Sequence, residues 1–261
     1  MSAERLISTL AAMTISHDVA GSGPTVVLLH STVCDRRMWE PQVPALVQAG
    51  WRVVRGDLRG FGETPVPDGP YNNAQDVVDL LDQLGVEEAA LVGASGGGRV
   101  ALEVAARWPR RVTALALLCT ASTGHEPSAE LRAVGEREDA LLEAGDVAGA
   151  TALNVDTWVG PHADEATREQ VRRMQQHAFE VQLAATEEFP QLRPEFDVAT
   201  IMARTLLVSG AHDLADFRRI AVGLAERIAG ARHLELDWAG HLPSLERPDE
   251  VNRLLVEFLR G

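Results

Sequence analysis

A single serine stands among glycines in the segment Leu91–Leu102, which reads LVGASGGGRVAL. Two kinds of chemistry use glycines in this way. Glycines can let backbone N–H groups surround a nucleotide phosphate, or they can let the chain turn sharply enough to present a serine hydroxyl as a nucleophile. Gly93, Ser95 and Gly97 have the G-x-S-x-G spacing of the second arrangement.

The phosphate interpretation is supported only in part. Gly96, Gly98 and Ala101 match G-x-G-x-x-A after an apolar run. That fingerprint also needs an acidic residue about 20 positions further on, at the end of the next strand, to bind a ribose hydroxyl. The next apolar run ends LALLCTAST without an acid, and the chain contains no lysine for a P-loop. We therefore predict a nucleophilic serine and no cofactor.

A serine hydroxyl is a weak nucleophile unless a neighbouring base accepts its proton. His241, in DWAGHLPSLERPDE, is the candidate base, and Asp213, in LLVSGAHDLADF, is the candidate acid that orients the imidazole. The order Ser95, Asp213, His241 is the one expected when a serine turn lies on a parallel sheet. Asp216 competes with Asp213 for the acid role, but we predict that Asp216 caps the following helix.

Six short apolar runs predict the strands that position these residues. They are Thr25–Leu29, Arg52–Asp57, Ala89–Gly93, Val112–Leu118, Thr205–Gly210 and His233–Leu236. Their composition is typical of strands buried on both faces, and helical spacing of apolar residues separates them. The pattern predicts an α/β fold with a mostly parallel central sheet flanked by helices. Ser95, Asp213 and His241 each follow a strand, so they should meet at the carboxyl edge of the sheet.

The alternation of strand and helix stops between residues 121 and 203, where the sequence looks helical throughout. We predict a core formed by residues 1–120 and 204–261, with a helical cap at 121–203 inserted before the last two strands. Trp158, Met174 and Phe179 of the cap are candidate pocket residues, although apolar residues at helical spacing more often pack inside a cap.

Composition narrows the class of partner. The net charge of −14 argues against nucleic acid, and no apolar run approaches the roughly 18 residues of a membrane span. The N-terminal MSAERLISTLAAMT is a poor signal peptide. Cys34 and Cys119 have no metal-like spacing, so we expect buried, reduced thiols and no metal. The expected protein is cytoplasmic and acts on a small molecule; a homo-oligomer is left open.

Over nearly its whole length the chain resembles the α/β hydrolases. The matching segments are VVLLH, DLRGFGET, the serine turn, GAHD and GH, and PDGPYNNAQDVVDLLDQLGVEEAALVG is similar to 3-oxoadipate enol-lactonases and related small esterases. The resemblance implies an α/β-hydrolase fold and an oxyanion hole formed by the backbone N–H groups of Thr32 and Gly96. The chain departs from the family at Ser31, where glycine usually follows His30; we expect His30 to brace this loop.

The expected activity is that of a carboxylic ester hydrolase that needs no cofactor. Ser95 would attack a small ester or lactone, His241 would accept and return the proton, and Asp213 would orient the imidazole. An acyl-enzyme would then be hydrolysed by water. Three alternatives remain open within the resemblance: a small-molecule receptor that keeps the triad, a perhydrolase, and a carbon–carbon bond hydrolase.

Overall fold

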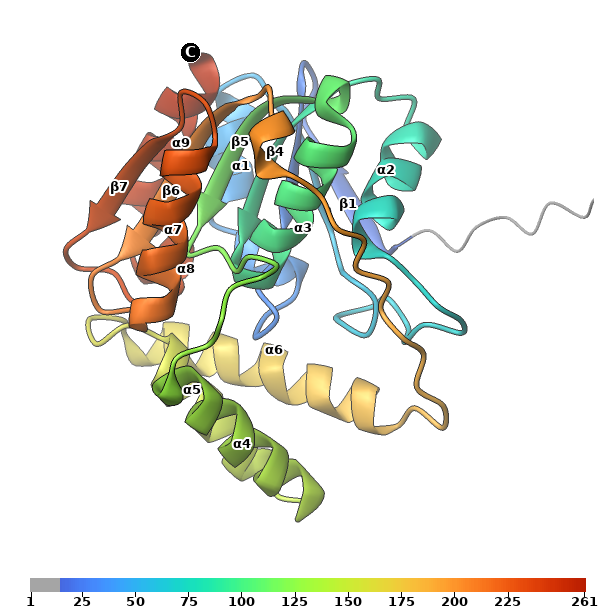
Figure 1. The fold of residues 1–261 in the computed structure, drawn as a ribbon, viewed down its shortest axis with the longest axis vertical. Helices are drawn as coiled ribbons and strands as arrows, with labels where there is room; N and C mark the ends of the chain where they lie inside the picture. Colours follow the sequence, from blue (N-terminus) through green and yellow to red (C-terminus); the bar gives the residue numbers. More distant parts are fainter. Residues whose placement is uncertain (1–14) are drawn as a thin grey trace, which may run out of the picture.

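The computed structural model describes residues 15–261, and in this part of the chain seven strands form one sheet (Figure 1). Their order across the sheet is β1-β3-β2-β4-β5-β6-β7, with β1 antiparallel to β3 and the other pairs parallel. The strands are β1 (His17–Ala20), β2 (Thr25–Leu29), β3 (Arg52–Gly56), β4 (Ala89–Ala94), β5 (Val112–Leu118), β6 (Arg204–Gly210) and β7 (Arg232–Leu236). The N-terminal stretch MSAERLISTLAAMT, which we expect not to be a signal peptide, lies outside the described residues.

The six predicted strands are confirmed to within one residue at each end. The sequence prediction missed β1, a short strand whose residues are mostly half-buried. It was also wrong about the environment of β7, because β7 is an edge strand and three of its five residues are exposed. An edge strand packs on fewer neighbours, so its sequence can carry Arg232 and Glu235 among the leucines.

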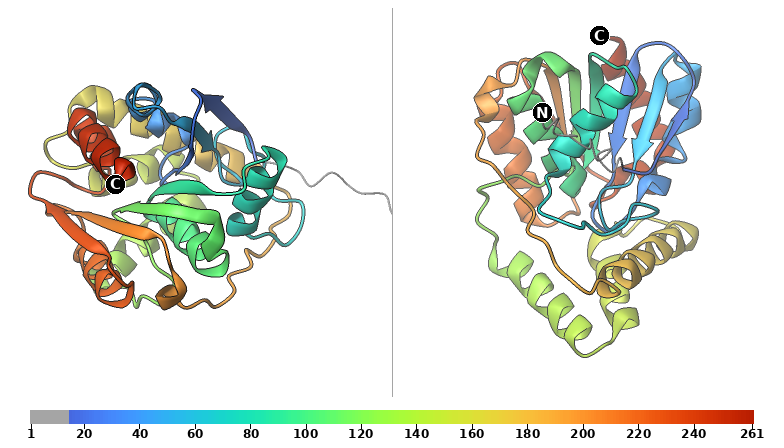
Figure 2. Two further views of the ribbon diagram at one scale, coloured as in Figure 1. Left: turned by 90° about the horizontal axis from the view of Figure 1, so that it is seen from above. Right: turned by 90° about the vertical axis from the view of Figure 1, so that its right-hand side faces the viewer.

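Helices cover both faces of the sheet (Figures 1 and 2). On one face lie α2 (Asn73–Gln83), α3 (Ser95–Arg107) and α7 (Ala215–Arg227); on the other lie α1 (Gln42–Gln48) and α9 (Pro248–Arg260), which contact each other. Three 3-10 helices, η1 (Arg36–Trp39), η2 (Pro109–Arg111) and η3 (Val198–Thr200), and the short α8 (Pro243–Glu246) complete the core. No helix among residues 15–261 is long and apolar enough to cross a membrane.

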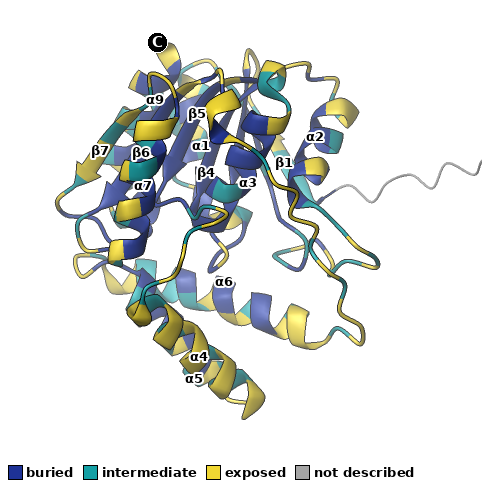
Figure 3. Cartoon of the chain, viewed as in Figure 1, coloured by how far each residue is buried: buried dark blue, intermediate teal, exposed yellow. Residues whose placement is uncertain are grey.

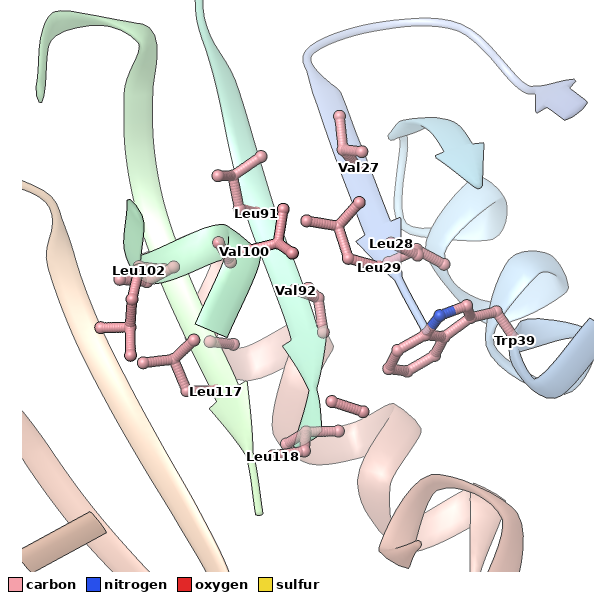
Figure 4. Close-up of a cluster of buried hydrophobic side chains, with 14 of the residues drawn as sticks. Val27, Leu28, Leu29, Trp39, Leu91, Val92, Val100, Leu102, Leu117 and Leu118 are labelled. Carbon is pink, nitrogen blue, oxygen red and sulfur yellow. The ribbon is translucent and has the colours of Figure 1, made fainter. Parts of the chain in front are cut away.

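The centre of the sheet is an apolar core (Figure 4). Every residue of β2 and β4 is buried, and branched aliphatic side chains pack between these strands and α3. The side chains labelled there include Leu28, Leu91, Leu117 and Val100. This packing holds the carboxyl end of β4, and therefore Ser95, in a fixed position.

Three helices form a separate layer beyond the carboxyl edge of the sheet (Figure 1). They are α4 (Ala129–Glu143), α5 (Val147–Trp158) and α6 (Glu165–Leu183), and α5 contacts both of the others. No residue of α4 is buried, whereas α6 buries one face, which includes Met174 and Phe179 (Figure 3).

The return from this layer to the core is not helical, which differs from the prediction of helix up to residue 203. After Leu183 the chain contains only the short η3 before β6. Pro190 and Pro194 disfavour helix in this segment. Its backbone instead pairs with the core, because Leu192 N–H donates to the Tyr71 carbonyl at 2.6 Å and Tyr71 N–H donates to Pro190 at 3.3 Å. The segment therefore lies against the loop that precedes α2.

Candidate active site

Ser95 lies at the sharp turn between β4 and α3. Its φ angle is 51°, a left-handed conformation that is costly for a residue with a side chain, and it is buried. The turn needs glycine on both sides. A Cβ atom on Gly93 would come within 2.6 Å of the Gly97 carbonyl oxygen, and one on Gly97 would come within 2.4 Å of two carbonyl oxygens at the end of β2. The G-x-S-x-G spacing is thus explained by close backbone approach.

His241 and Asp213 are in direct contact. His241 follows β7 and Asp213 follows β6, and the distance from His241 Nδ1 to Asp213 Oδ2 is 2.7 Å. The other carboxylate oxygen, Oδ1, accepts a hydrogen bond from Leu214 N–H at 2.7 Å. An ionised Asp213 can only accept, so Nδ1 of His241 carries the proton and the lone pair of the neutral ring is at Nε2. This is the tautomer that a general base for Ser95 requires.

Two aromatic side chains hold the imidazole of His241. Its ring centroid lies 4.2 Å from that of Phe217 on α7 and 4.7 Å from that of Trp158 on α5. Trp158 is itself fixed, because its Nε1–H donates to Asn154 Oδ1 at 2.7 Å. The cap therefore contributes directly to the position of the candidate base.

The loop after β2 lies against the start of α3. Thr32 is so close to Gly96 that a Cβ atom on Gly96 would be 2.5 Å from Thr32 Cγ2. The N-cap residue of α3, Ala94, gives its first turn no side-chain hydrogen bond. Within the described part of the chain, no acceptor binds the Thr32 N–H. The two N–H groups that the sequence singled out for an oxyanion hole therefore lie on adjacent segments.

Ser31, where the chain departs from the family pattern, makes hydrogen bonds within its own loop. Its hydroxyl accepts a weak hydrogen bond from Val33 N–H at 3.4 Å, and its N–H points to Met38 Sδ at 3.3 Å. His30 braces the same loop, as predicted: Nδ1 donates to the Ser31 carbonyl at 2.8 Å and Nε2 accepts from Leu58 N–H at 2.9 Å. Burial lowers the pKa of His30, so the ring is neutral in this role.

A cavity of about 390 Å³ opens between the core and the cap at Ser95. Of the predicted pocket residues, Trp158 and Phe179 line it and Met174 does not. Met174 is only 1% exposed and packs in the apolar core. Several polar residues of the wall are not predicted from the sequence. These are Arg99, Glu138, Asn154, Gln175 and Gln182. Arg99 could have been found from its spacing, since it follows Ser95 by one helical turn.

Asp216 does not cap α7, which corrects the prediction. The N-cap residue is Leu214, and Asp216 lies in the first turn with its side chain buried. Its Oδ1 accepts hydrogen bonds from Ser128 N–H and His125 Nε2, both at 2.8 Å. Burial alone would raise the pKa of Asp216, but these hydrogen bonds lower it to about 2. Asp216 therefore binds the segment that leads into α4 through hydrogen bonds. Asp213 is the acid that contacts His241.

Both cysteines are free and buried, as expected. Cys119, after β5, is close enough to Asp213 and His241 that potential ligand atoms of the three residues lie within 4.8 Å of one another. Burial raises the pKa of the Cys119 thiol well above its usual value. A neutral thiol is a poor metal ligand, and Asp213 and His241 already bind each other, so the arrangement favours acid–base chemistry at His241.

Known proteins resemble this chain over most of its length. The alpha/beta hydrolase family matches residues 26–254. RutD of Caulobacter segnis, named as a carbamate hydrolase, is 29% identical over 95% of this chain and 97% of its own. A hydrolase from Pseudomonas aeruginosa PA01 has a TM-score of 0.76 at 31% identity, covering 94% of both chains. An enol-lactonase from Burkholderia xenovorans LB400 has a TM-score of 0.78 at 30% identity, covering 95% of this chain and 96% of its own.

Proposed function

Because the chain belongs to the alpha/beta hydrolase family, we propose that it is a serine hydrolase that cleaves a small carboxylic ester or lactone through an acyl-enzyme on Ser95. One observation carries the proposal. A strained serine lines the same cavity as a histidine whose Nδ1 is bound to a buried carboxylate 2.7 Å away. That combination supplies a nucleophile, a base of the correct tautomer and a group that stabilises the imidazolium.

The reaction proceeds in two halves. His241 Nε2 accepts the proton of Ser95 Oγ as the oxygen attacks the substrate carbonyl carbon. The negative charge that develops on the carbonyl oxygen is stabilised by the N–H groups of Thr32 and Gly96. When the intermediate collapses, the C–O bond breaks and the imidazolium returns its proton to the leaving alkoxide. Water, activated by His241, then attacks the acyl group and releases the acid and free Ser95.

The substrate class draws support from the cavity and from the relatives. A volume of about 390 Å³ lies near the lower end of the range for small-molecule sites, so it suits a short acyl group or a single ring. Enol-lactones and carbamates, the compounds in the names of two relatives, each contain an acyl carbon bonded to a heteroatom. Esters, lactones and carbamates are therefore the compounds to assay.

A fluorophosphonate probe tests the nucleophile, and a substrate panel tests the reaction. We expect one equivalent of probe on the peptide that contains Ser95, no labelling in Ser95→Ala, and repeated turnover of p-nitrophenyl acetate by the wild-type protein. The panel then compares acetate to dodecanoate esters, γ- and δ-lactones and aryl carbamates. Absence of labelling at Ser95 contradicts the proposal, and a single slow burst with tight retention of product indicates a receptor.

A further inference from the structure

Two polar side chains of the cavity wall have no partner among the described residues. Arg99, on α3, makes no hydrogen bond with them and has no carboxylate within ion-pair distance. Gln175, on α6, is only 3% exposed. Its Oε1 is buried without a hydrogen-bond partner, and its N–H₂, the donor that an anion would need, makes no hydrogen bond with the described residues. Arg99 is half-buried, whereas Gln175 is buried. An arginine without an ion pair in the cavity wall, together with a buried amide without a partner, favours the binding of a polar group beside the nucleophile.

The surroundings of Arg99 leave its charge uncompensated. The next acid on the same face of α3 is Glu103, which is already bound to Arg107 at 2.6 Å and to Asn72 Nδ2 at 2.8 Å. The positive charge of Arg193 acts on Arg99 more strongly than the opposing effects of Glu103 and Tyr71. Burial, together with Arg193, lowers the pKa of Arg99. An anion in the cavity would relieve both the lack of hydrogen bonds and the unbalanced charge.

The position of Arg99 connects this anion site with the reaction. Residues four apart on a helix lie on the same face, about 6 Å apart along the axis, so Arg99 and Ser95 face one cavity one turn apart. Gln175 reaches the same cavity from the cap. A group held between Arg99 and Gln175 would therefore lie a few bond lengths from a carbonyl placed at Ser95.

We infer that the substrate carries a carboxylate, which Arg99 and Gln175 bind while Ser95 attacks the ester or lactone carbonyl. The inference rests on the proposed function and deepens it. One guanidinium presents N–H donors in a planar fork, and the amide N–H₂ of Gln175 adds a further donor to the second oxygen. A single negative charge matches this set.

The other charged group of the wall argues for a monoanion. Glu138 also lines the cavity, where its carboxyl accepts a hydrogen bond from Asn154 Nδ2. Burial raises the pKa of Glu138, so the ionised form of this carboxyl is disfavoured in the wall. When Glu138 is ionised, its negative charge repels a bound anion. A phosphate dianion would bring two charges into a cavity with one arginine and one carboxyl, whereas a carboxylate brings one. The substrate therefore enters with its carboxylate on the Arg99 side and away from Glu138.

Matched pairs of esters test the inference. We would measure kcat/KM for the mono-p-nitrophenyl esters of succinate, glutarate and adipate and for their methyl-capped neutral analogues, after subtracting spontaneous hydrolysis. The wild-type protein should prefer at least one charged ester over its neutral analogue. Arg99→Met should lower the charged-to-neutral ratio by about 10- to 100-fold, the usual range for losing hydrogen bonds to a charged group. Gln175→Met should lower it less.

Two control variants distinguish a carboxylate site at Arg99 from a general effect of the protein's electrostatic potential on a charged substrate. Arg253→Met removes one positive charge from the exposed face of α9, outside the cavity, and should leave the ratio within about twofold. Glu138→Gln should raise the ratio, because it removes the carboxyl whose ionised form would repel the anion. A wild-type ratio of one or below, or equal ratios in the wild type and a folded, fluorophosphonate-reactive Arg99→Met variant, overturns the inference.

Binding measurements keep the inference testable if the proposed function fails. In the Ser95→Ala protein, calorimetry should detect monomethyl glutarate binding at least tenfold more tightly than dimethyl glutarate, and Arg99→Met in that background should abolish the difference. Loss of turnover with this preference intact contradicts only the proposed function. Turnover of neutral esters without any preference contradicts only the carboxylate site.

Discussion

The Asp213→Asn substitution separates the chemistry of the candidate site from its structure. Both oxygens of Asp213 are engaged, one by His241 Nδ1–H and the other by Leu214 N–H, each at 2.7 Å. An asparagine whose oxygen stays on Leu214 turns its N–H₂ toward His241, so Nδ1 must become the acceptor and Nε2 must carry the proton. His241 can then no longer accept the proton of Ser95. The opposite orientation places the N–H₂ against the Leu214 N–H, which leaves two donors facing each other.

The loss of activity should therefore far exceed the loss of stability. Fixing the wrong histidine tautomer costs about 10⁴-fold in kcat in hydrolases of this kind, whereas one mismatched buried hydrogen bond costs about 1–3 kcal/mol of unfolding free energy. The assay is kcat/KM for a p-nitrophenyl ester, with urea unfolding on the same preparation.

Asp216→Asn is the matched control, since Asp216 is a buried acid three residues further on that does not contact His241. It should stay within about threefold of wild-type activity. If Asp213→Asn keeps a tenth of the activity, or if Asp216→Asn is the inactive variant, the acid has been misassigned.

Three further substitutions test the oxyanion loop, the hydrogen bonds of Asp216 to the segment before α4, and the serine turn. Thr32→Pro deletes a backbone donor and should lower kcat by about 10²–10³-fold, whereas Thr32→Ala should cost little; near-normal kcat in a folded Thr32→Pro protein places the donor elsewhere. The pKa of Asp216 is lowered from 3.8 to about 2 in the folded protein. Its carboxylate therefore contributes about 2 kcal/mol to the free energy of unfolding above about pH 4, and this contribution is lost as the pH drops toward 2. Acid unfolding followed by circular dichroism should show Asp216→Asn losing correspondingly less stability than wild type over that range, and parallel curves refute the role of Asp216. Gly97→Ala, whose new methyl group would lie 2.4 Å from two carbonyl oxygens, should lower the melting temperature by several degrees and abolish fluorophosphonate labelling, and an unchanged protein would contradict the packing of the turn.

The sequence predicts the sheet and its carboxyl edge well because buried strands require nearly continuous runs of apolar residues. All residues of β2 and β4 are buried, so their apolar runs define the strands to within a residue. Ser95, Asp213 and His241 could be selected because each follows such a strand and because the glycines beside Ser95 have a steric cause. Strands that are partly exposed have a less regular apolar pattern. For this reason the sequence does not predict β1, and it wrongly predicts that β7 is buried.

The cap and the cavity wall could not be predicted in the same way. Apolar residues of a cap helix face either neighbouring helices or the cavity, and periodicity does not distinguish the two. Trp158 and Met174 both fit the helical pattern, yet only Trp158 lines the cavity. The role of Asp216 depends on Ser128, which is 88 residues away in sequence, so a local pattern suggested a helix cap instead.

The central claim is that Ser95 carries the acyl group during turnover. Rapid acid quenching of the protein with a p-nitrophenyl ester, followed by peptide mapping by mass spectrometry, tests this most directly. The account predicts an initial release of one equivalent of nitrophenol and an acyl adduct on the peptide that contains Ser95. The adduct should accumulate when deacylation is slow and be absent in Ser95→Ala. An acyl group found on another residue, or steady hydrolysis by Ser95→Ala at the wild-type rate, would contradict the account.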